Sequence, residues 1–264
     1  MLTDERKEWN ATAYHAVSDP QFRWGLEVLE RVQLRGDETI LDAGCGTGRL
    51  TAKLAERLPS GRVLACDLSE NMVGVARDFL APQFGERVKV FAADMAHLDL
   101  DAAVDGVFST AAFHWVHDHQ ALFASLFRAL QPGGWIVAQC GGGANLARLY
   151  ARVAQLQKEP FFAEYFQNYQ DATHFTTPAK TTKRLRHAGF HDPEAYLTLA
   201  PTPFADANSF RAFITTVCVA KHLKELPAEL HDAFLDPLVA AAAHDHPPFT
   251  LDYQRLNLSA RKPA

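Results

Sequence analysis

Residues 39–50 read Thr-Ile-Leu-Asp-Ala-Gly-Cys-Gly-Thr-Gly-Arg-Leu, and this stretch decides the fold. Ile40 and Leu41 predict a short buried strand that ends at Asp42. Three glycines at alternate positions follow, and they let the backbone turn close to a ligand, because glycine has no side chain and tolerates positive φ. Leucine at every fourth position from residue 50 to 58 then predicts a helix. The glycines therefore lie at a junction between strand and helix.

The spacing of the glycines indicates the ligand. Dinucleotide-binding turns follow the pattern G-x-G-x-x-G and place a pyrophosphate at the helix N-terminus. Here the pattern is D-x-G-x-G-x-G, with Asp42 two residues before Gly44. A carboxylate at this position would repel a pyrophosphate and attract a cation. The pattern favours S-adenosylmethionine, which carries a sulfonium and an ammonium but no phosphate; a glycine turn without a ligand is the alternative.

Residues 40–48 resemble the first motif of the class I S-adenosylmethionine-dependent methyltransferases, and later motifs follow in the same order. The resemblance implies an α/β fold: a doubly wound, mostly parallel, Rossmann-like sheet of seven strands with a helical cap. It also implies an enzyme that transfers methyl groups. We expect an N-terminal helical lid segment at residues 1–35 and a cofactor-binding core at 36–140. Residues 141–264 should supply the remaining core strands and helix, with helical insertions that form a substrate cap.

Composition limits the choice of partner. The chain of 264 residues is 48% hydrophobic and 22% charged, which suits one large domain or a core with a cap. Its formal net charge of -5 argues against nucleic acid, and residues 109–115 lack the Asn/Asp-Pro-Pro-aromatic motif of amino-methylating DNA enzymes. We see no apolar run as long as a membrane span and no apolar core of a signal peptide. We therefore expect a cytoplasmic protein that acts on a small molecule, without nucleic acid or membrane as partner; oligomeric state stays open.

Acidic residues follow two further predicted strands. Asp67 ends the strand at 63–66, close to the roughly 20-residue offset from the glycine turn at which a carboxylate binds ribose hydroxyls. Asp94 follows the strand at 88–92. In the resembling family this position hydrogen-bonds the adenine amino group, whereas a helix-capping aspartate is the alternative. Ser69 is expected to cap the helix after Asp67.

The resemblance implies a set of cofactor-binding residues along the edge of the sheet. Tyr14, from an N-terminal helix that covers the cofactor in this family, either closes over the cofactor or anchors its own segment. Met72 either contacts adenine or packs in the core. Thr110 stands where many relatives carry Asn or Asp, so its side chain is a weaker candidate than its backbone. The full set is Tyr14, Asp42, Gly44, Cys45, Gly46, Asp67, Leu68, Met72, Asp94, Met95, Thr110 and Ala111.

Residues 110–119, Thr-Ala-Ala-Phe-His-Trp-Val-His-Asp-His, should join the cofactor site to the substrate site. His114 is a candidate substrate contact or general base, and a packed histidine is the alternative. Trp115 is a second candidate substrate contact. We expect no metal, because His117 and His119 should begin the next helix and their rings would not converge with that of His114. The four cysteines lack a C-x-x-C pair and are expected to be buried free thiols.

The rest of the chain predicts core elements and two helical insertions. Core elements are expected as a helix at 120–130, a Pro-Gly-Gly turn, a strand at 135–140, a helix at 179–187, and strands at 195–199 and 251–259. The insertions, at 141–169 and 206–244, would form a lid if they lie on one side of the sheet. Tyr165 and Tyr169 of the first insertion are candidate substrate contacts. Basic side chains that could bind an anionic group are Arg148, Arg152, Lys158, Lys183 and Arg184.

Three features look most like the trans-aconitate methyltransferase group, whose members methylate small carboxylates: the Trp-Asn-x-x-x-Tyr opening, the His-Trp-Val-x-Asp-His segment and the C-terminal cap. A carboxylate is ionised at neutral pH and needs no strong base, in keeping with the lack of an evident catalytic dyad. We therefore expect O-methylation of a carboxylate by direct in-line transfer. Alternatives are N-methylation, hydroxyl O-methylation or C-methylation with His114 as base, and an NAD-dependent or non-catalytic nucleotide-binding protein.

Overall fold

The computed structural model describes residue 11, residues 19–171 and residues 173–264. Tyr14, the aromatic residue expected to cover the cofactor, lies outside the described residues. Within these ranges, no helix has the length and hydrophobicity that are needed to cross a bilayer. The four cysteines are buried and free, as predicted.

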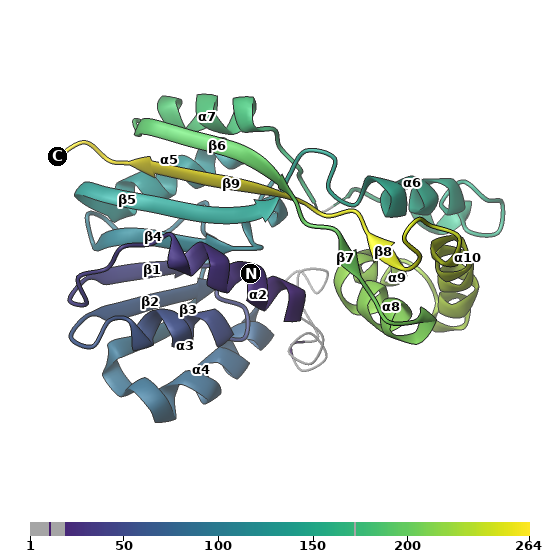
Figure 1. Ribbon diagram of the computed structural model, residues 1–264, viewed down its shortest axis with the longest axis horizontal. Helices are drawn as coiled ribbons and strands as arrows, with labels where there is room; N and C mark the ends of the chain where they lie inside the picture. The colour runs from purple at the N-terminus through teal and green to yellow at the C-terminus, as the bar shows by residue number, and fades with distance from the viewer. Residues whose placement is uncertain (1–10, 12–18, 172) are drawn as a thin grey trace.

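One sheet of seven strands forms the centre of the protein (Figure 1). Its strands are β1 (Thr39–Ala43), β2 (Arg62–Asp67), β3 (Val88–Ala92), β4 (Val104–Thr110), β5 (Leu130–Gly141), β6 (His191–Leu199) and β9 (Gln254–Arg261). Their order is β3-β2-β1-β4-β5-β9-β6. β1 to β5 run parallel, and β9 pairs antiparallel with both β5 and β6. The predicted doubly wound, mostly parallel sheet is confirmed, and its strand order reverses between β1 and β4, where such sheets bind ligands.

Helices cover both faces of the sheet and bury a separate apolar core on each. One face carries α2 (Asp19–Glu30), α3 (Arg49–Glu56) and α4 (Glu70–Phe84), and the other carries α5 (His119–Ala129) and α7 (Pro178–His187). Ala76 and Leu80 of α4 are buried on the first face, as are Leu122 and Leu126 of α5 on the second, because the residues of each pair are four positions apart and lie on one side of their helix. Ser69 caps α4 as predicted, since its hydroxyl accepts a hydrogen bond from the N–H of Met72 at 3.3 Å.

A third apolar core forms a helical cap beside the sheet (Figure 1). Its regular elements are α6 (Ala147–Leu156), α8 (Ala207–Phe213), α9 (Ala220–Leu223), α10 (His231–Ala243) and the paired strands β7 (Thr202–Pro203) and β8 (Thr250–Leu251). The cap also contains the short 3-10 and π turns η4 (Ala163–Phe166), η5 (Ile214–Cys218) and η6 (Ala228–Leu230), whereas η2 (Gly85–Arg87) and η3 (Phe113–Trp115) belong to the part of the chain around the sheet. Val153 of the first insertion and Phe234 of the second are buried in this one core. The two insertions therefore pack together, beyond the carboxyl end of β5.

Three strands have boundaries that differ from the sequence-based predictions, and one of them, β6, begins at His191 and not at residue 195. β5 begins at Leu130 rather than at residue 135, and its pairing with β4 changes register around the Pro-Gly-Gly turn. The expected last strand at 251–259 is divided, because Leu251 lies in β8 and β9 begins at Gln254. The reason is that Leu251 is buried in the cap core, whereas Leu256 is buried in the core of the sheet. The chain has to turn between these two cores.

Candidate active site

The glycine turn between β1 and α3 is tied to the end of β2. The N–H groups of Gly44 and Cys45 donate to the carbonyl oxygen of Cys66, at 2.8 and 2.9 Å. The N–H of Gly46 donates to Oδ2 of Asp67 at 2.9 Å. Main-chain groups and one carboxylate thus fix the shape of the turn against the neighbouring strand.

Glycine is found at the three positions of the turn for different physical reasons. All three adopt positive φ, at 86° for Gly44, 54° for Gly46 and 83° for Gly48. A methyl group at Gly44 would lie 2.2 Å from Cβ of Ala112, and one at Gly48 would lie 2.8 Å from the side chain of Leu80. At Gly46 it would meet nothing within 4 Å among the described residues. Packing inside the protein therefore requires the outer two glycines, and Gly46 is the one that borders open space.

Asp67 is positioned by hydrogen bonds at both carboxylate oxygens. Oδ2 accepts from the N–H of Gly46, and Oδ1 accepts from the N–H of Ser69 at 3.0 Å. A carboxylate oxygen can accept more than one hydrogen bond, so the carboxylate at this strand end is a group of the kind that binds ribose hydroxyls. Leu68 beside it is 44% exposed and presents an apolar surface next to the carboxylate.

Asp42 lies beneath the turn and is 2% exposed. Its Oδ2 accepts a hydrogen bond from the hydroxyl of Thr51 at 2.7 Å. Burial, with a smaller contribution from the charge of Asp67, raises the pKa of Asp42 to about 7 against the opposing effect of the Thr51 hydrogen bond. A cationic ligand nearby would favour the ionised carboxylate.

Asp94 has partners of its own in this structure. Its Oδ1 accepts from the N–H of Ala96 at 2.9 Å, and its Oδ2 lies 3.0 Å from Nδ1 of His97. It therefore caps a turn after β3, and not a helix as the alternative interpretation expected, because the described residues between β3 and β4 form no helix. The adenine contact stays a prediction. Met72 and Met95 are both buried, at 4% and 7% exposure.

The segment after β4 places His114 where its hydrogen bonds indicate which ring nitrogen carries the proton. Thr110 ends β4, and Ala111, at a φ of 55°, donates its N–H to the carbonyl of Gln139 at 2.7 Å. The N–H of Gly141 donates to Nδ1 of His114 at 3.3 Å. Burial, followed by nearby positive charges, lowers the pKa of His114 well below its usual range, so the ring is neutral. A neutral imidazole that accepts at Nδ1 carries its proton on Nε2, which makes Nε2 a hydrogen-bond donor.

The neighbouring histidines point to different partners. Nε2 of His119, which is 2% exposed, lies 2.9 Å from the carbonyl oxygen of Phe113. His117 is exposed. In the described part of the chain, no group of three histidine, cysteine, aspartate or glutamate residues is arranged to hold a metal ion. His119 thus serves packing, next to the aromatic ring of Phe123 at 5.8 Å.

Lys221 of α9 is a cap residue that sequence analysis missed. Its ammonium hydrogen-bonds Asp171 and, at 2.8 Å, the hydroxyl of Thr173. It lies 4.8 Å from the ring centroid of Tyr150 and 5.8 Å from that of Trp115. The ring of Trp115 is in turn 5.2 Å from that of His114. Nothing in the sequence distinguished this lysine from exposed ones, since the neighbours that enclose it are distant along the chain.

The two tyrosines predicted as substrate contacts differ in position. Tyr169 lies with its ring 5.1 Å from the ring of His222, which follows Lys221. Tyr165 packs against the apolar core of the cap. The structure brings Tyr169 to the Lys221 region, and it gives Tyr165 a packing role.

The arginines predicted to bind an anion are half-buried and hydrogen-bond to groups of the protein itself. Arg152 makes two hydrogen bonds to Asp245, at 2.6 and 3.0 Å. Arg148 donates to the carbonyl of Thr250 at 2.7 Å. Arg184 donates to the hydroxyl of Thr176 at 3.0 Å, while Lys158 and Lys183 are exposed. Arg148 and Arg152 thus connect α6 to the segment that follows α10.

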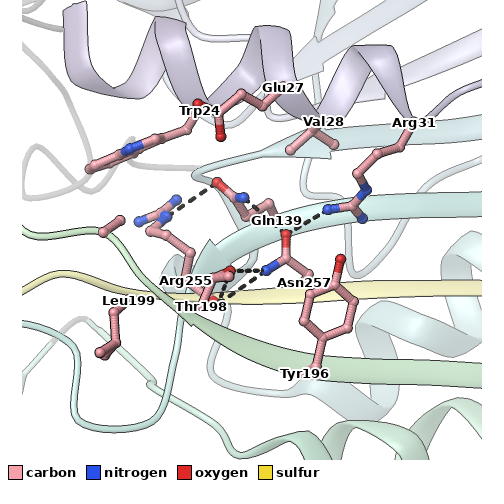
Figure 2. Close-up of a pocket in the computed structure, with 11 residues that line it drawn as sticks. Trp24, Glu27, Val28, Arg31, Gln139, Tyr196, Thr198, Leu199, Arg255 and Asn257 are labelled. Atoms are coloured by element: carbon pink, nitrogen blue, oxygen red, sulfur yellow. Dashed lines mark hydrogen bonds between the residues drawn. The ribbon is translucent and has the colours of Figure 1, made fainter.

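A second missed cation, Arg255, lies in a pocket of about 370 Å³ between α2 and the strands β5, β9 and β6 (Figure 2). It is 3% exposed, and its Nε donates to Oε1 of Gln139 at 3.3 Å. Its guanidinium lies 4.5 Å from the ring centroid of Trp24. Figure 2 shows it beneath Trp24, with Arg31 at the other side of Asn257. This arginine and Lys221 are the charged groups that most disfavour a proton on His114.

Comparison with known proteins gives the family. Residues 40–134 match a family model described as a methyltransferase domain. A trans-aconitate 2-methyltransferase of Variovorax paradoxus (strain S110) is 30% identical over 231 residues, which cover 86% of each chain. The chain belongs to the class I S-adenosylmethionine-dependent methyltransferases. A trans-aconitate 2-methyltransferase of Methylobacterium nodulans is 29% identical over 97% of this chain and 98% of its own.

A solved structure shows that the methyltransferase shares its fold with more distant enzymes. Phosphoethanolamine N-methyltransferase 2 of Haemonchus contortus, in complex with phosphomonomethylethanolamine and S-adenosylhomocysteine, superposes with a TM-score of 0.65 at 20% identity. The superposition covers 99% of this chain and 60% of that one. At this identity the likeness concerns the fold.

The residues present in the methyltransferase fit S-adenosylmethionine as its cofactor. Among the described residues nothing lies within 4 Å of a methyl group placed at Gly46, and the carboxylate of Asp67 puts negative charge beside it, which suits a cationic ligand. The same carboxylate is an acceptor group suited to ribose hydroxyls, and Leu68 offers an apolar surface next to it. Together with family membership, this chemistry decides against the dinucleotide alternative.

Proposed function

We propose that this methyltransferase esterifies a carboxylate of a small organic acid. The charge around His114 carries the proposal, because a neutral imidazole donor has Arg255 and Lys221 as its main charged neighbours. An anionic acceptor is attracted to such a site, whereas a cationic amine is repelled. The curated relatives named as trans-aconitate 2-methyltransferases support this acceptor class.

A carboxylate acceptor makes few chemical demands on the protein. When bound, S-adenosylmethionine supplies an electrophilic methyl group on a sulfonium, which a carboxylate oxygen takes up without losing a proton. The protein then has to align the acceptor and exclude water, and orientation alone supplies on the order of 7–11 kcal/mol. The Nε2 proton of His114 is suited to orient a carboxylate oxygen, and the cap next to the sheet edge is suited to exclude water.

The geometry disfavours the alternatives that need a base. A hydroxyl, amine or carbon acceptor would require His114 to accept a proton. Its Nδ1 already accepts from Gly141, and in that tautomer Nε2 has no lone pair to offer. The same hydrogen bond that makes His114 a donor therefore supports a role in orienting the acceptor over a role as base.

The chemical stability of the product tests this function. Purified protein is incubated with methyl-tritiated S-adenosylmethionine and a panel of mono-, di- and tricarboxylic acids that includes trans-aconitate. Methyl esters release volatile methanol in base, whereas N-, C- and ether-linked methyl groups are retained. We expect base-labile label on at least one polycarboxylic acid. A base-stable product, or no product with any acid, contradicts the carboxylate proposal.

A further inference from the structure

The side chain of Lys221 is much less exposed than that of a typical surface lysine. Its side chain is 10% exposed, while that of its partner Asp171 is 45% exposed. An ammonium has three N–H donors, and those of Lys221 serve Asp171 and Thr173, with no hydrogen-bond partner for the third among the described residues. Removing such a charge from water is costly, so the position of this lysine calls for a reason beyond packing.

Two polar atoms next to Lys221 are also buried without partners. The hydroxyl of Tyr169 and Nδ1 of His222 find no hydrogen bond in the part of the chain that the structure describes. His222 is 2% exposed, and its ring lies 5.1 Å from that of Tyr169. Buried polar groups in folded proteins are nearly always paired, and unpaired ones cost about 1–3 kcal/mol each. Three unused polar groups in one small region therefore indicate a polar ligand.

Aromatic rings connect this region to His114. The ring of Phe175 lies 5.7 Å from that of His114 and 6.0 Å from that of Tyr150, which borders Lys221. The ring of Trp115 lies 5.2 Å from that of His114, and the ammonium of Lys221 lies 5.8 Å from the Trp115 ring centroid. Aromatic rings thus link the unpaired polar groups of the cap to the donor of the core.

We propose that Lys221, Tyr169 and His222 form a cap subsite that binds a carboxylate of the acceptor other than the one that is methylated. This inference rests on the proposed function, since it takes the acceptor to be an organic acid placed at His114. An ammonium and a phenol hydroxyl are donors that suit a carboxylate, and a charge-assisted hydrogen bond in a site lined by rings is strong. The subsite selects acids with two or more carboxylates.

Asp171 acts as the placeholder for that carboxylate. Without acceptor, it compensates the buried charge of Lys221. Because Asp171 is half-exposed and lies outside helices and strands, it returns to water at low cost when an acceptor carboxylate takes its place. It therefore competes with the acceptor, and its removal strengthens acceptor binding.

Two substitutions with opposite predicted effects test the subsite. We compare Lys221→Met and Asp171→Asn, with the exposed Lys224→Met as matched control, using crotonate, fumarate and trans-aconitate as acceptors. Lys221→Met should raise KM for trans-aconitate about 10- to 100-fold, and it should raise KM for crotonate, which has no second carboxylate, far less. Asp171→Asn should lower that KM, and Lys221→Arg should restore part of the binding. Calorimetry with adenosylhomocysteine checks that the variants are folded, and calorimetry of trans-aconitate with that complex measures acceptor binding directly.

The outcomes separate this inference from the proposed function. An ion pair that only holds the cap in place would make both substitutions raise KM for all three acids and lower thermal stability, and this result overturns the subsite. Unchanged KM for trans-aconitate in Lys221→Met also overturns it, while esterification by the wild type still upholds the function. If the wild type neither binds nor esterifies any acid, the proposed function itself is wrong, and the subsite with it.

Discussion

Oδ2 of Asp67, at the end of β2, accepts a hydrogen bond from the N–H of Gly46 at 2.9 Å. The residue that should bind the ribose of the cofactor therefore also holds the glycine turn in place. Because its other oxygen accepts from Ser69, the carboxylate is fixed before any ligand arrives. The site is organised in advance, which lowers the entropic cost of binding.

Asp67→Asn should weaken cofactor binding almost as much as Asp67→Ala. Both oxygens of Asp67 face N–H donors, so the amide NH₂ of asparagine would oppose a donor at one of them. We expect the Kd for adenosylhomocysteine to rise about 10- to 100-fold in calorimetry, from the loss of charged hydrogen bonds. The exposed Asp101→Asn is the control. Wild-type affinity in Asp67→Asn would show that this carboxylate does not bind the ligand.

Gly46→Ala should impair binding more than folding. Its φ of 54° strains alanine by about 1–2 kcal/mol, but the methyl group meets no described neighbour. Gly133→Ala is a matched control, because Gly133 also has positive φ and described surroundings that are open. Both variants should lose similar thermal stability, and only Gly46→Ala should lose stabilisation by adenosylhomocysteine. Equal ligand stabilisation in both would exclude Gly46 from the cofactor site.

Asp42 should make stability fall as pH rises toward neutrality. The folded protein holds a proton on this carboxyl up to a pKa of about 7, whereas the unfolded chain releases it near the ordinary value of 3.8. The native state binds more protons in this window, so its contribution to the free energy of unfolding is lost as pH rises through it, by up to about 4 kcal/mol. Urea unfolding at pH 5 and pH 7.5 should show this loss in the wild type relative to Asp42→Asn. Parallel pH dependence of the two proteins would contradict the raised pKa.

His114 should give no inflection in the pH–rate profile between pH 6 and 8. Its pKa is lowered well below the usual range by burial and by Arg255 and Lys221, so the ring stays neutral throughout. We expect His114→Ala to raise the acceptor KM about tenfold, through loss of one hydrogen bond, with the affinity for adenosylhomocysteine retained. A profile that rises with a pKa near 6.5, together with rescue of the variant by added imidazole, would instead establish a general base.

Local sequence signals predicted most of the sheet and one edge of the site. The strand Val88–Ala92 has the predicted bounds, and Ser69 caps its helix, because apolar runs and capping residues act within a few positions. The glycine turn and the aspartates at strand ends were also predicted from patterns of neighbouring residues. The sequence did not show that Gly44 and Gly46 are glycine for different reasons. The residue that leaves no room for a side chain at Gly44 is Ala112, which is distant in sequence from the turn.

The sequence by itself predicted the edge of the sheet at which a ligand is expected, because parallel strands bring their carboxyl ends to one edge and residues such as Asp42 and Asp67 stand at those ends. Tertiary structure alone decided which basic side chains are enclosed. Lys221 is held by Asp171 and by rings from other elements, and Arg255 lies under Trp24 of the first described helix. Whether a basic side chain is solvated or enclosed depends on neighbours contributed by distant segments, and no local pattern of residues carries that information.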